Sequence, residues 1–219
     1  MQTRPVHSVL RLPIAAGALA TVAVVASLLV APPAAADLVV GTNGDDRLRG
    51  TARADRILAR GGDDRVQALA GTDLVRGGPG EDFLFGDRGD DRVLGNQGDD
   101  TFVPGMGDDI VRGGLGNDIW NGSSGNDDHG GGPGRDSINA GSGADEVQGG
   151  DGRDFLFGGL GDDRIFGGNN GDTIDLTAGD GAPPGADGGS DLVSCGAGID
   201  TVNGAEADDD VSANCEVVT

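Results

Sequence analysis

The chain has 219 residues, of which 44 are glycine and only 3% are aromatic, and its formal net charge is −22. All 15 basic residues are arginines, which excludes mechanisms that need a lysine, such as Schiff-base chemistry or a phosphate-binding P-loop. A surface this acidic repels nucleic acid and anionic membranes. The composition instead favours cations as partners.

Residues 1–36 have the pattern of an export signal. A short stretch with two arginines precedes an apolar run over 12–31, and three alanines at 34–36 fit a cleavage site. The pattern predicts a signal peptide over 1–36 and a secreted mature chain that begins at Asp37 and has no membrane span. A transmembrane anchor is the alternative, because the apolar run is long enough to approach a span. The two prolines at 32–33 and the alanines favour cleavage.

The chain from residue 41 to residue 175 is a nine-residue repeat. Blocks of nine, with places numbered one to nine, run 15 times without an insertion. Place six is aspartate in all 15 blocks, place four is glycine in 13, and place eight is apolar in 14, with His129 as the exception. A disordered acidic tail is the alternative, but low-complexity sequence does not hold phase over such a length.

These blocks resemble the calcium-binding nonapeptide repeat of RTX proteins, G-G-x-G-x-D-x-U-x, in which U is a large apolar residue. Residues 77–85 read GGPGEDFLF and residues 158–166 read GGLGDDRIF. The resemblance implies an all-β fold, a right-handed parallel β-roll in which two blocks make one coil. It also implies calcium ions between successive turns.

The residue chemistry supports calcium binding at place six. Calcium takes carboxylate and carbonyl oxygens, and a glycine-rich turn exposes its carbonyls next to the aspartate. Because two blocks make a coil, each site is expected to be shared by aspartates 18 residues apart, such as Asp82 and Asp100. The candidate calcium ligands are Asp46, Asp55, Asp64, Asp73, Asp82, Asp91, Asp100, Asp109, Asp118, Asp127, Asp136, Asp145, Asp154, Asp163 and Asp172.

Calcium is also predicted to drive folding. Places seven to nine are expected to form a three-residue strand with only the place-eight side chain pointing inward. One such side chain per block cannot offset the conformational entropy of ordering nine residues. Stacking and charge neutralisation predict about 8–13 bound calcium ions, and a largely disordered chain without them.

The C-terminal segment returns to the repeat after a slip. Asp191, Asp200 and Asp209 are again nine apart, whereas Asp172 and Asp191 are 19 apart. One degenerate block with one extra residue is therefore expected, with the slip in 179–185. The predicted domains are the signal peptide over 1–36, the β-roll over 37–175, and a cap of degenerate repeats over 176–219.

The two cysteines are predicted to close that cap. In the resumed register Cys195 and Cys215 lie on adjacent coils, within the span of a disulfide, and export makes a disulfide chemically stable. Two unpaired thiols are the alternative. A terminal cap of this kind closes the open end of a repeat fold.

Several residues allow more than one interpretation. Trp120 is expected to stack on Phe102 in the core. His129 is interpreted as a local defect, with a pH switch as the alternative. Four phenylalanines at outward places share one face, where they mark a docking surface for a protein or surface partner, or else cover their own strands. They are Phe83, Phe85, Phe155 and Phe157.

The function predicted from these features is non-enzymatic. The chain has no HExxH motif and no nucleophile paired with a histidine. Place five lacks the ranks of threonine and asparagine that ice binding needs. The prediction is a secreted calcium-binding module for extracellular binding or scaffolding. The alternative is a calcium-dependent adhesin, or a detached module that acts with a separate toxin or hydrolase.

Overall fold

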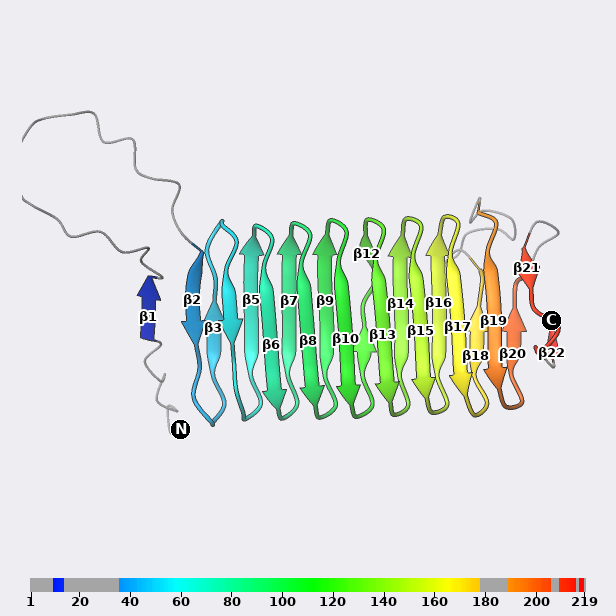
Figure 1. The fold of residues 1–219 in the computed structure, drawn as a ribbon, viewed down its shortest axis with the longest axis horizontal. Coiled ribbons are helices and arrows are strands. Elements are labelled where there is room, and N and C mark those ends of the chain that lie inside the picture. The colour runs from blue at the N-terminus through cyan, green and yellow to red at the C-terminus, as the bar shows by residue number, and fades with distance from the viewer. Residues whose placement is uncertain (1–9, 14–35, 178–188, 206–208, 216, 219) are drawn as a thin grey trace, which may run out of the picture.

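The protein is an all-β solenoid. The computed structural model describes residues 10–13, 36–177, 189–205, 209–215 and 217–218. Every regular element in these ranges is a strand, and the strands form two 11-stranded sheets stacked along one axis (Figure 1). Within the same ranges no helix is long and apolar enough to cross a membrane. The predicted all-β parallel roll is confirmed.

Alternate strands belong to alternate sheets. The first sheet contains β1 (Leu10–Pro13), β2 (Asp37–Val40), β4 (Arg56–Leu58), β6 (Leu74–Pro79), β8 (Arg92–Gln97), β10 (Ile110–Leu115), β13 (Asp128–Pro133), β15 (Glu146–Asp151), β17 (Arg164–Asn169), β19 (Leu192–Ala197) and β21 (Asp210–Val211). The second contains β3 (Arg47–Arg49), β5 (Arg65–Ala70), β7 (Phe83–Arg88), β9 (Thr101–Met106), β11 (Ile119–Trp120), β12 (Ser123–Ser124), β14 (Ser137–Ser142), β16 (Phe155–Leu160), β18 (Thr173–Asp175), β20 (Thr201–Asn203) and β22 (Val217–Val218).

Neighbouring strands of each sheet pair in parallel at an offset of two blocks. Val75 pairs with Val93 in the first sheet, and Leu84 pairs with Phe102 in the second. Two blocks therefore make one coil, as predicted. The pairing of β1 with β2 is antiparallel. The rest of the predicted signal peptide, residues 1–9 and 14–35, lies outside the described residues.

Most strands are twice as long as predicted. In the regular coils they have six residues and run from place seven of one block to place three of the next. The parallel register continues over the glycine-rich places, where Gly114 pairs with Asn96 and Gly105 with Asp87. The sequence pattern missed this extension because glycine is a poor strand former outside such a ladder. The turn that remains consists of places four to six.

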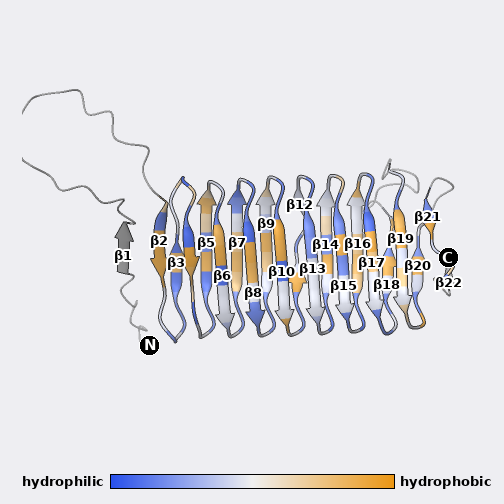
Figure 2. Ribbon diagram, in the orientation of Figure 1, coloured by the Kyte–Doolittle hydropathy of each residue, from blue (hydrophilic) through white to orange (hydrophobic). Residues whose placement is uncertain are grey.

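The core consists of the place-eight side chains of both sheets, with place-one residues such as Ala59 and Ala68 beside them. The place-eight residues point inward, and Val93, Val111 and Leu84 are fully buried. Trp120 stacks on Phe102 with ring centroids 4.8 Å apart, which confirms the predicted core contact. Hydrophobic residues occupy the middle of the strands and hydrophilic residues the turns (Figure 2).

His129 is a member of the core row rather than a break in it. It is fully buried, and β13 pairs on both sides, with Val111 opposite His129 on β10 and Val147 opposite it on β15. The backbone is therefore regular at His129, although both ring nitrogens are buried without a hydrogen-bond partner among the described residues. The strand pattern is interrupted instead between β11 and β12, at residues 121–122.

The C-terminal slip is an insertion rather than a degenerate block. Ile165 of β17 pairs with Val193 of β19, and Ile174 of β18 pairs with Val202 of β20. The next regular block thus stacks directly on the last one, and the predicted degenerate block has no place between them. The count of 19 residues could not distinguish these arrangements. Residues 179–185 lie outside the described residues.

The C-terminal coils carry the predicted disulfide. Cys195 on β19 is bonded to Cys215 after β21, with 5.1 Å between their Cα atoms. The Cys195 side chain is fully buried among the core residues.

The four phenylalanines lie on the second sheet, on β7 and β16. Phe83 and Phe155 are 48% and 39% exposed, whereas Phe85 and Phe157 are half-buried. The Arg65 guanidinium lies 4.5 Å from the centre of the Phe85 ring, so part of this apolar surface is covered from within the chain. A role in docking remains a prediction.

Candidate metal centre

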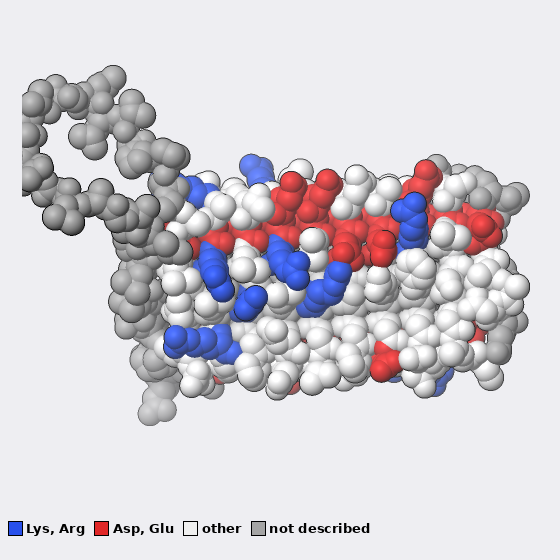
Figure 3. All heavy atoms as spheres, viewed as in Figure 1, with Lys and Arg blue, Asp and Glu red and all other residues white. Residues whose placement is uncertain are grey.

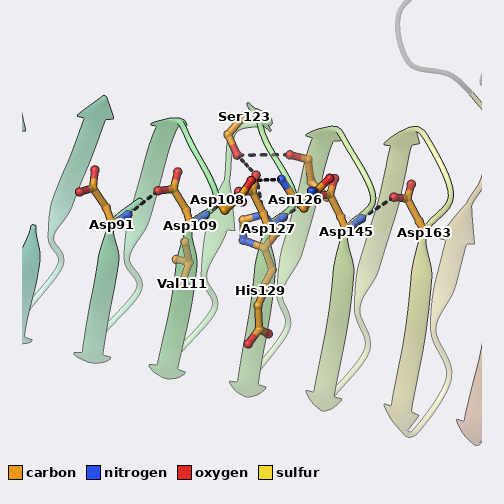
Figure 4. A network of polar contacts seen from close by, with 12 residues as sticks. Asp91, Asp108, Asp109, Val111, Ser123, Asn126, Asp127, His129, Asp145 and Asp163 are labelled. Atoms are coloured by element: carbon orange, nitrogen blue, oxygen red, sulfur yellow. Dashed lines mark hydrogen bonds and ion pairs between the residues drawn. The ribbon is translucent and has the colours of Figure 1, made fainter. Parts of the chain in front are cut away.

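The predicted ligands lie in two rows, one along each edge where the chain turns. All 15 place-six aspartates are buried, with at most 6% of any of them exposed. Five members of one row, Asp91, Asp109, Asp127, Asp145 and Asp163, lie on successive coils in Figure 4. Acidic side chains also gather along the turn edge of the surface in Figure 3. The place-six aspartates therefore lie at the turns, and their role as calcium ligands remains a prediction.

Within each row, aspartates 18 residues apart are in direct contact. The backbone N–H of Asp82 donates to Oδ1 of Asp100 at 2.8 Å, and the backbone N–H of Asp91 donates to Oδ1 of Asp109 at 2.8 Å. The row continues across the C-terminal insertion, where the backbone N–H of Asp172 donates to Oδ1 of Asp200 at 2.9 Å. The sequence analysis had left Asp200 out of the candidate set, although its phase was visible.

The second carboxylate oxygen, Oδ2, has no hydrogen-bond partner among the described residues in 12 of the 15 blocks. Asp200 shares this property. These aspartates are Asp64, Asp73, Asp82, Asp91, Asp100, Asp109, Asp118, Asp136, Asp145, Asp154, Asp163 and Asp172. A buried charged oxygen without a partner is costly, and it requires an explanation in any native fold.

In eight of these 12 blocks, Oδ2 faces the space that a glycine at place one leaves open. A Cβ built on Gly149 would lie 2.6 Å from Oδ2 of Asp154 and 2.5 Å from the carbonyl oxygen of Gly167 on the next coil. A carboxylate oxygen and a carbonyl oxygen from different coils thus converge on one point. An alanine there would require both to move.

Burial makes the rows electrostatically unfavourable. Desolvation, reinforced by the carboxylates of Asp82 and Asp118, raises the pKa of Asp100 to about 8. Desolvation, reinforced by the carboxylates of Asp73 and Asp109, raises the pKa of Asp91 to about 7. The backbone hydrogen bond that each carboxylate accepts lowers its pKa but does not offset burial. A cation between the coils would remove this penalty.

The donor set fits calcium. Within the described residues no three His, Cys, Asp or Glu side chains are grouped so that they could hold a metal ion alone. Any ion would therefore need backbone carbonyls beside the aspartates. Calcium accepts a shell made entirely of oxygens of both kinds, whereas zinc prefers nitrogen and sulfur ligands.

Three blocks differ from the other 12 because a hydroxyl occupies Oδ2. Thr42 Oγ1 donates to Oδ2 of Asp46 at 2.9 Å, and Thr51 Oγ1 donates to Oδ2 of Asp55 at 3.0 Å. Ser123 Oγ donates to Oδ2 of Asp127 at 2.5 Å. The sequence analysis missed these contacts, although serine or threonine at place two was a visible signal.

The electrostatics of Asp127 differ accordingly. Burial raises its pKa, but the His129 ring and the Ser123 hydroxyl outweigh burial and lower the pKa below its ordinary value. His129 Nε2 lies 3.8 Å from Oδ2 of Asp127, beyond hydrogen-bond distance. We therefore attribute the specific contact to Ser123 and a weaker electrostatic attraction to His129.

A second ladder at place five was also missed. The backbone N–H of Asp108 donates to Oδ1 of Asp90 at 3.0 Å, and the backbone N–H of Asn126 donates to Oδ1 of Asp108 at 2.8 Å. This exposed ladder runs in the opposite direction to the buried one. Its sequence signal is an Asp-Asp or Asn-Asp pair at places five and six.

The comparisons with known proteins agree with this geometry. No curated protein matches the chain significantly. The family model described as RTX calcium-binding nonapeptide repeat (4 copies) matches residues 40–75, 67–102, 105–128, 130–165 and 148–181. These matches cover more than half of the 219 residues and contain every candidate aspartate. The repeat is a structural, calcium-binding unit and not a catalytic domain. The chain belongs to the family of RTX calcium-binding nonapeptide-repeat proteins.

Proposed function

We propose that this protein is an exported, non-enzymatic calcium-binding β-roll that folds when calcium binds along its two aspartate rows. The 15 place-six aspartates are the proposed ligands, and the roll is proposed to bind about 8–13 ions. Residues 1–36 act as the signal peptide, 37–175 form the roll, and 176–219 form the cap. Outside the cell the folded roll serves as a binding or scaffold module.

The observation that carries this proposal is the set of buried Oδ2 atoms. Thirteen place-six aspartates, with Asp200 included, bury an Oδ2 for which the described residues offer no donor. A fold that buries so many carboxylate oxygens without a donor needs positive charge beside them. Calcium supplies two positive charges and accepts oxygen ligands in flexible geometry.

The chain's own residues would hold the ion in a defined way. In the 12 blocks without a hydroxyl on Oδ2, a backbone N–H of the preceding coil holds the aspartate through Oδ1, as at Asp100 and Asp109, and leaves Oδ2 available to ligate. Glycine at place one keeps the adjoining space open, as at Gly149. The aspartates are thus oriented by the same stacking that a bound ion would stabilise.

Export is supported by the basic, apolar and small-residue pattern of residues 1–36 and by the family, whose members are generally secreted. We expect the secreted protein to begin at Asp37. Intact-mass analysis of secreted material tests this, and retention of Met1 would favour the anchor alternative.

Titration calorimetry of the purified chain with calcium, followed in parallel by far-UV circular dichroism, tests the calcium proposal. Ion binding and the gain of β structure are expected to occur together, because the ligands are brought together only by folding. A chain that binds no calcium at millimolar concentration would contradict the proposal.

An adhesin is the second candidate, and the exposed rings of Phe83 and Phe155 favour it over a purely structural role. Replacement of both rings by serine would then abolish calcium-dependent capture of a surface or protein partner. Folding would be retained, because both rings point away from the core. If the double variant captured the partner as well as the unmodified chain does, the face that carries these rings would not be the adhesive surface.

A further inference from the structure

The backbone at place two has two conformations. In 12 of the 15 blocks the place-two residue has a positive φ, and in three it does not. The 12 are Arg60, Leu69, Gly78, Asp87, Asn96, Gly105, Gly114, Gly132, Gly141, Gly150, Gly159 and Gly168. The three are Thr42, Thr51 and Ser123.

This division coincides with the state of the place-six aspartate. Every block with a positive φ at place two leaves Oδ2 without a partner in the described chain, and every block without it has a hydroxyl bonded to Oδ2. The coincidence holds in all 15 blocks. It extends to the cap, where Gly196 has a φ of 86° and Asp200 has an unpaired Oδ2 within the same described region.

The peptide orientation explains the coincidence. The backbone N–H of Arg60 donates to the carbonyl of Gly77 on the next coil at 2.9 Å. The backbone N–H of Thr42 points instead to Oδ2 of its own Asp46 at 2.5 Å, and Thr51 makes the same contact with Asp55 at 2.5 Å. These two blocks satisfy the carboxylate with two donors of their own.

The positive φ at place two occurs even in four blocks where the residue is not glycine. Arg60, Leu69, Asp87 and Asn96 adopt it although they carry side chains, with φ between 72° and 90°. Such a conformation is costly for Arg60 and Leu69 and less so for Asp87 and Asn96, and it persists where the surroundings require it. Thr42 shows that a place-two residue can donate hydrogen bonds to Oδ2 of its own block. These four blocks nevertheless leave Oδ2 unpaired in the described structure. The strain is consistent with an external partner for Oδ2.

We propose that place two decides which turns take calcium, and that Thr42, Thr51 and Ser123 mark three turns that take none. The inference rests on the proposed function and reduces its ligand set from 15 place-six aspartates to 12. It makes the first coil, with Asp46 and Asp55, independent of calcium. It also places one calcium-free turn at Asp127, in the middle of the row shown in Figure 4.

The test compares two aspartates of the same row. Asp91→Asn changes a block with an unpaired Oδ2 whose row neighbours, Asp73 and Asp109, have the same property in the described structure. Asp127→Asn changes the block that Ser123 satisfies. Native mass spectrometry of the purified chain in calcium counts the ions bound to each variant. We expect Asp91→Asn to lose one or two ions and Asp127→Asn to lose none. An equal loss in both variants would overturn the inference.

Ser123→Gly provides the second arm, because it removes the hydroxyl and leaves Asp127 in place. Glycine can adopt the positive φ seen at place two elsewhere. The ion count is expected to rise by at least one, and an unchanged count would show that the hydroxyl does not exclude calcium. If neither the unmodified chain nor Asp91→Asn binds calcium, the proposed function itself has failed, and that result is distinct from the two above.

Discussion

The first coil and the central coils have the same fold but differ in how their carboxylates are satisfied. In the first coil, Thr42 and Thr51 donate hydrogen bonds to Asp46 and Asp55, and the strands β3 and β4 have only three residues. In the central coils, Asp100 and Asp118 bury an Oδ2 that has no partner in the described chain, and the strands β9 and β10 have six residues. The comparison shows that the chain itself satisfies the place-six carboxylate in some blocks and not in others.

The largest expected effect is the loss of the central coils when calcium is removed. In excess chelator at neutral pH, the unpaired carboxylates repel one another and most β structure is expected to disappear. Trp120 reports this directly, because it is 2% exposed and stacks on Phe102. Its emission should shift to the red in chelator and return to the blue in millimolar calcium. Native-like emission and circular dichroism in chelator would contradict calcium-driven folding.

Magnesium is the matched control for that experiment. It prefers a tighter octahedral shell and keeps its waters, so it is expected to restore the Trp120 signal poorly. A full response to magnesium would show that charge alone, rather than the oxygen geometry of the turns, drives folding.

The second effect is on pH dependence without calcium. In the folded chain the pKa is about 8 for Asp100, about 7 for Asp91 and about 6 for Asp73, each raised from 3.8. A raised pKa means that the folded state binds more protons than the unfolded state. Stability from these groups is therefore fully present below about pH 4 and is lost as pH rises through about 6 to 8.

Acidification in chelator should consequently restore β structure to the central coils, because protons replace the missing cation. Circular dichroism between pH 8 and pH 4 measures this. In calcium the same scan should be flat at the alkaline end, since calcium binding displaces the protons. A chain that gains β structure in chelator as the pH rises would contradict the raised pKa values of the buried aspartates.

The third effect separates the two regions by substitution. Asp100→Ala with Asp118→Ala removes two carboxylates with unpaired Oδ2 in the described structure, whereas Asp46→Ala removes one that Thr42 already satisfies. The calcium midpoint of the Trp120 signal should rise at least about tenfold for the double variant, which corresponds to about 1.4 kcal/mol. For Asp46→Ala it should change less than about twofold. Equal shifts per removed carboxylate would abolish the distinction between the first coil and the centre.

The repeat phase predicts much of this architecture. The place of a residue in its block decides whether it points inward, so the contact of Trp120 with Phe102 and the pairing of Asp82 with Asp100 follow from counting. The same counting brings Cys195 next to Cys215. These predictions depend only on an unbroken period and on two blocks per coil.

The features that the repeat phase does not predict depend on backbone conformation. The φ at place two is invisible in the sequence, because both glycine and Arg60 adopt the positive value. The hydrogen bond that satisfies Asp127 was not predicted, although Ser123 at place two was a visible signal, and the extension of the strands over places one to three was not predicted either. The 19-residue spacing after Asp172 was equally ambiguous, because a degenerate block and an insertion give the same count.

The smallest expected effect concerns the opposite end of the solenoid. The first coil is completed by hydrogen bonds from Thr42 and Thr51, whereas the last coils are joined by the bond between Cys195 and Cys215. The bond closes a loop of 20 residues, which corresponds to at most about 3 kcal/mol from reduced entropy of the unfolded chain. Replacement of both cysteines by serine should therefore loosen the coils after β18 without changing the calcium midpoint of Trp120, several coils away. Hydrogen exchange would detect faster exchange in β19 and β21 and unchanged exchange in β8 and β10. If the Trp120 midpoint moved as far as it does in the Asp100 and Asp118 double variant, the cap would control the folding of the whole roll. The central coils would then no longer depend on calcium alone.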